Sequence, residues 1–189
     1  MSNGTTTTTT TTTTVLITGV ARGIGLSLLK HYLLRPNHTI LATIRTLPTP
    51  PEIHPHYTLP KAKTTTLHIL PLENTLPESF PTLLTILTST LAIKSIDIVI
   101  ANSGICPEPG TPATVSLDAV AESFEVNTLG TMRLFQTARG LLEKSTVEGG
   151  PKWVTVSTGA ASLGLFGVHR AGWLAGYGVG KVGLGWFTL

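Results

Sequence analysis

Tyr177 and Lys181 stand four residues apart, the spacing at which two side chains share one face of an α-helix. A phenol has a pKa of about 10, which is too high for efficient proton exchange near neutral pH. An ammonium group beside it favours the phenolate and lowers that pKa. The pair therefore indicates proton transfer at a phenol. The spacing is common in helices, so its meaning depends on the elements that surround it.

A glycine-rich loop, Thr-Gly-Val-Ala-Arg-Gly-Ile-Gly at residues 18–25, follows an apolar run and precedes a helical pattern. Glycines allow a tight turn and a close backbone approach to a pyrophosphate, and the helix N-terminus supplies N–H groups. The spacing departs from the general dinucleotide pattern, so a turn without a ligand is an alternative. Residues 178–183 fit Gly-x-Gly-x-x-Gly literally, but they lie inside the last predicted helix and are not interpreted as a phosphate loop.

Hydrophobic periodicity predicts alternating strands and helices. Strands are expected at 15–18, 39–44, 65–70, 96–101 and 153–156, and helices at 23–34, 76–93, 116–142 and from 175 onward. The strands are continuous apolar runs, which is typical of a parallel sheet covered by helices on both faces. The predicted class is a doubly wound, Rossmann-type α/β fold. Ligands in such folds bind beyond the carboxyl ends of the strands.

Composition indicates one domain, residues 15–189, behind a low-complexity Thr-rich tail at 1–14 whose last threonines are suited to extend the first strand. The 13 Lys and Arg are scattered, which disfavours nucleic-acid binding. The sequence contains no run of about 18 apolar residues, so no membrane span is predicted. The single cysteine, Cys106, fits a reducing, cytoplasmic compartment. No metal site is predicted.

The glycine loop together with the Tyr-x-x-x-Lys pair resembles the short-chain dehydrogenase/reductase family. Several stretches, among them 99–102, 134–139 and 175–181, are similar to fungal ketoreductases of the C-factor and norsolorinic-acid-reductase type. The resemblance implies hydride transfer between a nicotinamide cofactor and a carbonyl or secondary alcohol, with an aromatic or polyketide-derived ketone as substrate. In the loop it assigns cofactor binding to Gly19, Arg22, Gly23, Ile24 and Gly25.

The end of the second predicted strand carries Arg45 and no carboxylate. An acidic residue there binds the ribose of NAD, whereas an arginine accommodates the 2′-phosphate of NADP. With Arg22 as a second cation, the sequence favours NADP(H); the alternative is that Arg45 merely opens a surface loop. By resemblance, Glu73 contacts the adenine, or is a plain surface glutamate, and Asn102 and Gly104 lie near the cofactor.

By the same resemblance Tyr177 is the proton donor, Lys181 tunes it and holds the nicotinamide ribose, and Asn127 bends its helix and links the proton relay to solvent. The hydroxyl that orients the substrate carbonyl is assigned to Thr158, where the family commonly has serine. Ser157 and Ser162 remain alternatives.

Members of this family continue beyond the Tyr-Lys helix with two more strands and a segment that covers the substrate, so the chain is interpreted as C-terminally truncated. The sequence leaves two candidate functions, which belong to different classes of protein. The first is an NADP(H)-dependent carbonyl reductase with a small-molecule substrate, possible as a homo-oligomer. The second is a non-catalytic dinucleotide-binding remnant, and turnover of a ketone distinguishes the two.

Overall fold

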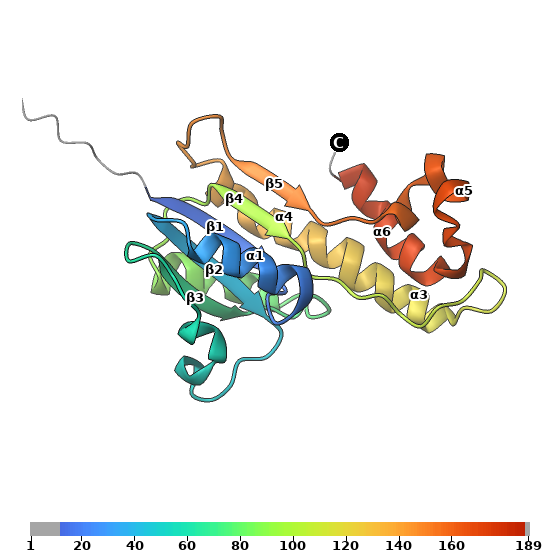
Figure 1. The fold of residues 1–189 in the computed structure, drawn as a ribbon, viewed down its shortest axis with the longest axis horizontal. Coiled ribbons are helices and arrows are strands. Elements are labelled where there is room, and N and C mark those ends of the chain that lie inside the picture. The colour runs from blue at the N-terminus through green and yellow to red at the C-terminus, as the bar shows by residue number, and fades with distance from the viewer. Residues whose placement is uncertain (1–11, 188–189) are drawn as a thin grey trace, which may run out of the picture.

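A computed structural model describes residues 12–187, so most of the predicted Thr-rich tail lies outside the described residues. Five strands form one sheet, and all of their pairings are parallel (Figure 1). Their bounds are β1 Thr13–Thr18, β2 His38–Ile44, β3 Thr66–Pro71, β4 Ile98–Ala101 and β5 Lys152–Thr155. Thr13 and Thr14 belong to β1, as their β propensity predicted.

The strand order is β3-β2-β1-β4-β5, with β1 between β2 and β4. The chain therefore moves outward from β1 to β3, then crosses back and continues on the other side with β4 and β5. The order reverses between β1 and β4, and this is the point at which doubly wound sheets bind their ligands. The predicted fold class is confirmed, and the described residues form no strand after β5.

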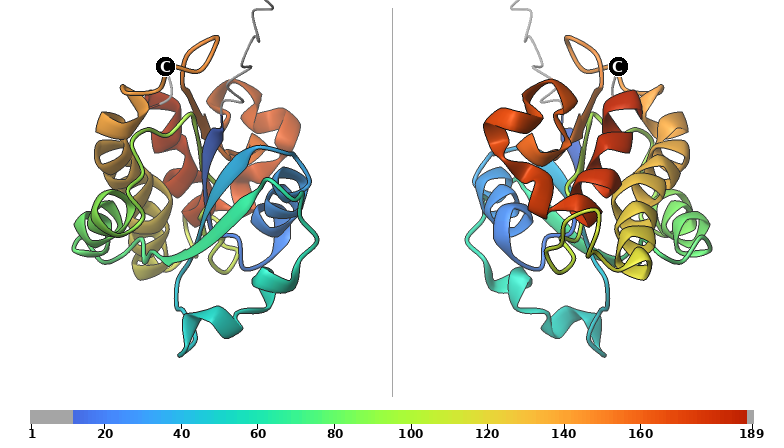
Figure 2. Two further views of the ribbon diagram at one scale, coloured as in Figure 1. Left: turned by 90° about the vertical axis from the view of Figure 1, so that its left-hand side faces the viewer. Right: turned by 90° about the vertical axis from the view of Figure 1, so that its right-hand side faces the viewer.

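Helices cover both faces of the sheet (Figure 2). Helix α1 lies on one face, whereas α2, α4 and α6 lie on the other, and α3 runs into α4. Their bounds are α1 Gly23–Leu33, α2 Ser79–Thr85, α3 Leu117–Phe124, α4 Gly130–Leu142, α5 Phe166–His169 and α6 Ala175–Phe187.

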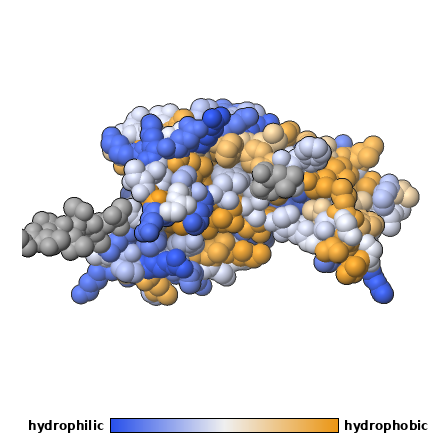
Figure 3. Space-filling model, turned by 90° about the horizontal axis from the view of Figure 1, so that it is seen from above, coloured by the Kyte–Doolittle hydropathy of each residue, from blue (hydrophilic) through white to orange (hydrophobic). Residues whose placement is uncertain are grey.

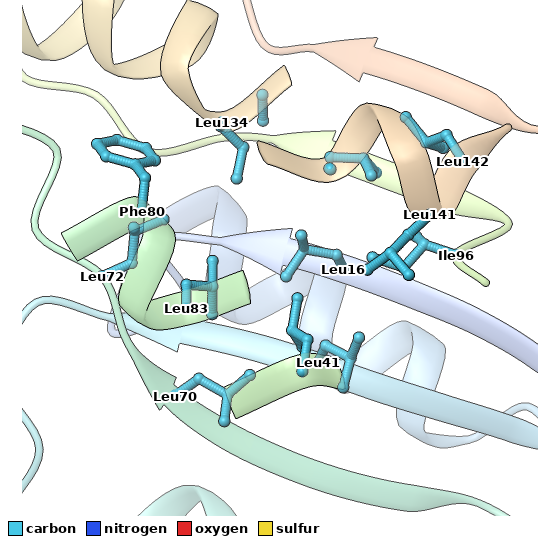
Figure 4. Packing of buried hydrophobic residues seen from close by; sticks show 14 residues of the cluster. Leu16, Leu41, Leu70, Leu72, Phe80, Leu83, Ile96, Leu134, Leu141 and Leu142 are labelled. Carbon is cyan, nitrogen blue, oxygen red and sulfur yellow. The ribbon is translucent and has the colours of Figure 1, made fainter. Parts of the chain in front are cut away.

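Two apolar clusters fill the spaces between the sheet and the helices. The first joins strand residues such as Leu16 and Leu41 to Leu83 of α2 and Leu134 of α4 (Figure 4). The second, on the other face, packs α1 against residues of β1, β2 and β3. Leu16 and Leu41 are fully buried, and burying one such side chain contributes about 1.5–3 kcal/mol. These cores fix the strand ends that carry the loops discussed below.

Two predicted helices are interrupted in the structure. The helix predicted at 76–93 ends at Thr85 and continues only as a π-turn over Ile86–Thr90. The long helix predicted at 116–142 is divided into α3 and α4 by a second π-turn, Glu125–Leu129. A π-turn adds a residue to the helical repeat without changing the apolar pattern strongly, so periodicity did not reveal it.

Helix α6 packs closely on α3 and on the π-turn that follows it. A Cβ atom at Gly180 would collide with Ser123 Oγ, and one at Gly183 would lie 2.6 Å from Thr128 Cγ2. Thr128 Oγ1 also donates a hydrogen bond to the Gly180 carbonyl at 2.7 Å. The glycine pattern at 178–183 therefore serves close packing between helices, consistent with its rejection as a phosphate loop.

Candidate active site

The glycine loop between β1 and α1 is fixed by hydrogen bonds to its neighbours on both sides. Thr18 Oγ1 accepts from the backbone N–H groups of Asn102 and Ser103, each at 3.0 Å. The Asn102 side chain donates to the carbonyls of Thr18 and Gly19, at 2.9 and 3.2 Å. On the opposite side, the Gly19 N–H donates to the Thr43 carbonyl of β2 at 3.0 Å. The loop thus bridges β4 and β2.

Glycine is required at two positions of this loop. Gly19 has φ +71°, a left-handed conformation that other residues rarely adopt. A Cβ at Gly25 would overlap the Gly19 carbonyl oxygen and lie 2.5 Å from Asn102 Nδ2. Arg22, at the N-cap of α1, has extended backbone and makes no side-chain capping bond. The first N–H groups of α1 and the backbone of the glycine loop therefore form a cradle that is open to an anion.

A pocket of about 510 Å³ lies along the carboxyl ends of the strands. Its lining comes from the segments after all five strands, together with Val126 of the π-turn and Tyr177 and Lys181 of α6. Every residue predicted to bind the cofactor lines it: Gly19, Arg22, Gly23, Ile24, Gly25, Arg45, Glu73, Asn102, Gly104, Tyr177 and Lys181. Because the strand order is β3-β2-β1-β4-β5, Arg45 and Glu73 lie toward one end of this pocket and Tyr177 and Lys181 toward the other.

Arg45 and Glu73 form an ion pair at the β2–β3 end, with Arg45 Nε 3.0 Å from Glu73 Oε2. The Arg45 side chain is 69% exposed, whereas that of Glu73 is 22% exposed. Glu73 Oε1 accepts from the N–H and hydroxyl of Thr75, at 3.2 and 3.1 Å. Since Glu73 uses both oxygens in these contacts, its position differs from that of an uncommitted surface glutamate. Only Nε of the Arg45 guanidinium is used in this pair.

Lys181 is 4% exposed, and its Nζ donates to the Val156 carbonyl after β5 at 2.9 Å. Burial lowers the pKa of Lys181 from its ordinary value. Burial and the nearby Cys106 thiol raise the pKa of Tyr177, while a hydrogen bond with Thr158 lowers it. The sequence predicted a phenol pKa lowered by Lys181. In this arrangement the ammonium instead binds a carbonyl, and loss of solvent around the phenol has the larger effect.

Among the three candidate hydroxyls, that of Thr158 is the one that lowers the pKa of Tyr177. Thr158 Oγ1 also accepts from the Ala160 N–H at 3.3 Å, which fixes the side chain at the start of a short 3₁₀ turn. Ser157 is exposed, and Ser162 lies at the end of that turn. The geometry therefore favours Thr158 as the hydroxyl next to the phenol.

Asn127 lies in the π-turn between α3 and α4 and is fully buried. Its Oδ1 accepts from the Ile105 N–H and its Nδ2 donates to the Ile105 carbonyl, both at 2.9 Å. Nδ2 also donates to Ser123 Oγ at 3.0 Å. A Cβ at Gly104 would lie 2.7 Å from Asn127 Oδ1 and 3.0 Å from Lys181 Nζ. Asn127 therefore clamps the loop after β4 beside Lys181 and does not itself line the pocket.

Replacing Asn127 with aspartate should lower the free energy of unfolding by about 2–3 kcal/mol, because a buried carboxylate would face the Ile105 carbonyl without a donor. Urea denaturation measures this change. Glu122→Gln on the exposed surface of α3 is the matched control and should leave stability nearly unchanged. An Asn127→Asp protein as stable as the original would contradict the clamp.

Sequence reasoning missed three residues at the site. Thr18 was interpreted as the end of the first strand and the start of the glycine loop, yet its hydroxyl also anchors the β4 loop. Ser103 and Cys106 line the pocket beside assigned residues. Their position directly after β4 was a usable signal, since every loop at the carboxyl edge contributes to the site.

Among the described residues, no three His, Cys, Asp or Glu side chains gather as a metal site requires, and no helix there is long and apolar enough to cross a bilayer.

The parallel sheet, the glycine cradle at its switch point and the Tyr-Lys pair in the same pocket define a dinucleotide-binding α/β protein. The sequence model of the short chain dehydrogenase family matches residues 13–188. The chain belongs to this family, whose members are oxidoreductases that use a nicotinamide dinucleotide. The expected family resemblance is thereby confirmed.

Relatives of several kinds match the chain. A short-chain dehydrogenase (srdF) of Neurospora crassa is 35% identical over 92% of this chain and 67% of its own length. A norsolorinic acid ketoreductase (nor1) of Dothistroma septosporum is 30% identical over 88% of this chain and 61% of its own length. The NADPH-bound carbonyl reductase from chicken fatty liver superposes with a TM-score of 0.78 at 25% identity, over 94% of this chain and 72% of that one. The chain thus spans about two thirds of the length of these fungal relatives.

Proposed function

We propose that the protein is an NADP(H)-dependent carbonyl reductase that acts on an aromatic or polyketide-type ketone. The observation that carries this proposal is that the same pocket holds both groups of residues. Arg22 and Arg45 line one part of it, Tyr177 and Lys181 line another, and the glycine cradle lies between them. The cradle fits a pyrophosphate, because Gly25 leaves no room for a side chain and α1 presents uncapped N–H groups.

In this proposal each residue has a separate task. The bound nicotinamide supplies the hydride to the carbonyl carbon. Tyr177 donates its phenolic proton to the carbonyl oxygen, and Thr158 orients that oxygen through its hydroxyl. Lys181, anchored on the Val156 carbonyl, adds positive charge beside the developing negative charge. Asn127 holds the loop after β4 in place.

The preference for NADP(H) is proposed from the β2 end of the pocket. That end carries Arg45, and an arginine there accommodates a 2′-phosphate. Glu73 contacts only Nε of the Arg45 guanidinium, so the two terminal nitrogens of that guanidinium can donate to a phosphate. The similarity to an NADPH-bound carbonyl reductase supports the same choice.

The preference for an aromatic ketone is proposed from two observations. Three of the relatives are norsolorinic acid ketoreductases, from Dothistroma septosporum, Emericella nidulans and Aspergillus parasiticus. The segment between Thr158 and α6 also exposes apolar side chains, on the end of the molecule that carries α5 (Figure 3). These side chains are Leu163, Leu165, Phe166, Val168 and Trp173. These side chains belong to the segment that leads into α6, the helix that carries Tyr177, and an exposed apolar surface there suits an apolar, flat substrate.

Titration with NADPH and NADH, followed by nicotinamide fluorescence, tests the proposal. NADPH should bind more tightly than NADH, and Arg45→Ala should raise the dissociation constant for NADPH about tenfold by removing charge-assisted hydrogen bonds. The NADH value should change little. Arg139→Ala is the matched control, because it removes a similarly exposed arginine from α4 without touching this pocket. Equal affinity for the two nucleotides would refute the NADP(H) preference.

A second candidate is a nucleotide-binding protein without turnover, because the residues predicted to bind the cofactor line the pocket whereas Thr158 and Asn127 do not. Oxidation of NADPH in the presence of a panel of aromatic ketones separates the two. Steady consumption of NADPH with formation of the alcohol supports the reductase, whereas tight binding without consumption supports the second candidate.

A further inference from the structure

The segment 48–60 between β2 and β3, the Pro-rich segment, packs beside the glycine loop and has no task in the function proposed above. Its second 3₁₀ turn, Pro55–Thr58, carries His56, which is 8% exposed. His56 Nε2 lies 2.9 Å from the carbonyl oxygen of Val20 in the glycine loop. Because a carbonyl only accepts, Nε2 carries the hydrogen and donates it.

Val20 is held from both directions. Its N–H donates to the Thr43 carbonyl of β2 at 3.0 Å, its carbonyl accepts from His56, and its side chain is fully buried. Arg22 follows two residues later as the N-cap of α1 and lines the pocket. The turn that presents Arg22 to a nucleotide is therefore anchored through the peptide groups of Val20.

The Pro-rich segment is itself fixed, so it can hold the imidazole in place. His54 Nδ1 accepts from the His56 N–H at 3.3 Å, and the two rings meet edge to face with centroids 4.4 Å apart. Burial and the neighbouring His56 lower the pKa of His54. Tyr57 ties the same segment to β3, since its hydroxyl accepts from the Ile69 N–H at 3.1 Å.

We propose that His56 is a positioning residue for the dinucleotide site: by donating to the Val20 carbonyl, it holds the turn before Arg22 in the conformation that binds the nucleotide. This inference rests on the proposed function. Without the donor, the Val20 carbonyl loses its partner, and the turn populates other conformations. The apparent dissociation constant for a nucleotide then rises in inverse proportion to the population that remains competent.

Three variants test this role, with NADPH as the probe. His56→Phe keeps an aromatic ring but removes the donor, and it should raise the dissociation constant for NADPH about tenfold. Amide hydrogen exchange across residues 18–25 of the free protein should become faster. His56→Gln carries an N–H donor the same number of bonds from the backbone as Nε2, so it should restore both readouts.

Tyr57→Phe is the matched control, because it removes the hydrogen bond that joins the same segment to β3. It should lower stability and leave NADPH binding unchanged. The inference is overturned if His56→Phe binds NADPH as the original protein does, or if His56→Gln is as weak as His56→Phe. Failure of the original protein to bind either nucleotide would refute the proposed function instead, and the exchange comparison would still decide whether His56 anchors the loop.

Discussion

Replacing Tyr177 with phenylalanine should lower the rate of ketone reduction by about 10²–10⁴-fold, the range for loss of a general acid. The phenol lines the pocket beside Lys181, and burial raises its pKa in the free protein, so it holds the proton that the carbonyl oxygen takes up. Phenylalanine fills the same space next to Thr158, and the pocket for the nucleotide should persist. Initial rates of NADPH oxidation with an aromatic ketone, measured at saturating NADPH, give the effect.

Two measurements make this result interpretable. NADPH titration of the Tyr177→Phe protein should show that the nucleotide still binds, which excludes a folding defect. Tyr32→Phe on α1 is the matched control, because Tyr32 does not line the pocket. Undiminished turnover of Tyr177→Phe would remove the phenol from the mechanism and leave Thr158 as the neighbouring hydroxyl to examine.

Gly25→Ala should have the second large effect, a weakening of NADPH binding by about 10- to 100-fold. A methyl group at this position would overlap the Gly19 carbonyl and press on Asn102 Nδ2. Overpacking of this kind costs about 1–3 kcal/mol, and here it displaces the backbone that forms the cradle. Fluorescence titration with NADPH measures the loss.

Gly140→Ala separates this effect from a general consequence of replacing glycine. Gly140 lies in α4, and a Cβ there would meet no atom within 4 Å. The substitution should raise the free energy of unfolding by about 0.5–1 kcal/mol, because alanine loses less conformational entropy in a helix. If Gly25→Ala binds NADPH as tightly as Gly140→Ala does, the close approach of α1 to the loop is not needed for binding.

The sheet and its coverage by helices were predictable because buried parallel strands are rich in continuous apolar residues, and apolar runs such as 40–42 and 98–101 are bounded by polar residues. The interruptions were not predictable on the same grounds. The π-turn at Glu125–Leu129 has three consecutive buried residues, Val126, Asn127 and Thr128, and the contacts that cover them form only in the folded protein. The 3₁₀ turns of the Pro-rich segment depend on tertiary contacts such as that of His56 with Val20.

The residues predicted to bind the cofactor were found because their position after a strand can be recognised in the sequence. The groups with which they form ion pairs and hydrogen bonds could not be recognised in this way. The ion pair of Arg45 with Glu73 joins two loops whose side chains meet only after β2 and β3 have paired in register. The bond from Lys181 to the Val156 carbonyl likewise depends on where α6 packs. A pKa prediction made from helical spacing alone therefore had the wrong sign for Tyr177.

The π-turn between α3 and α4 has a consequence for how the chain tolerates changes in length. Its consecutive residues Asn127 and Thr128 face different partners, since Asn127 holds Ile105 and Thr128 holds Gly180 of α6. Each residue of an α-helix advances the direction of the side chain by about 100°. Loss of one residue from this turn would produce the regular helix that periodicity alone describes, and it would turn one partner away from its contact. The enlarged turn thus acts as a spacer of fixed length, and the site is sensitive there to the number of residues as well as to their identity.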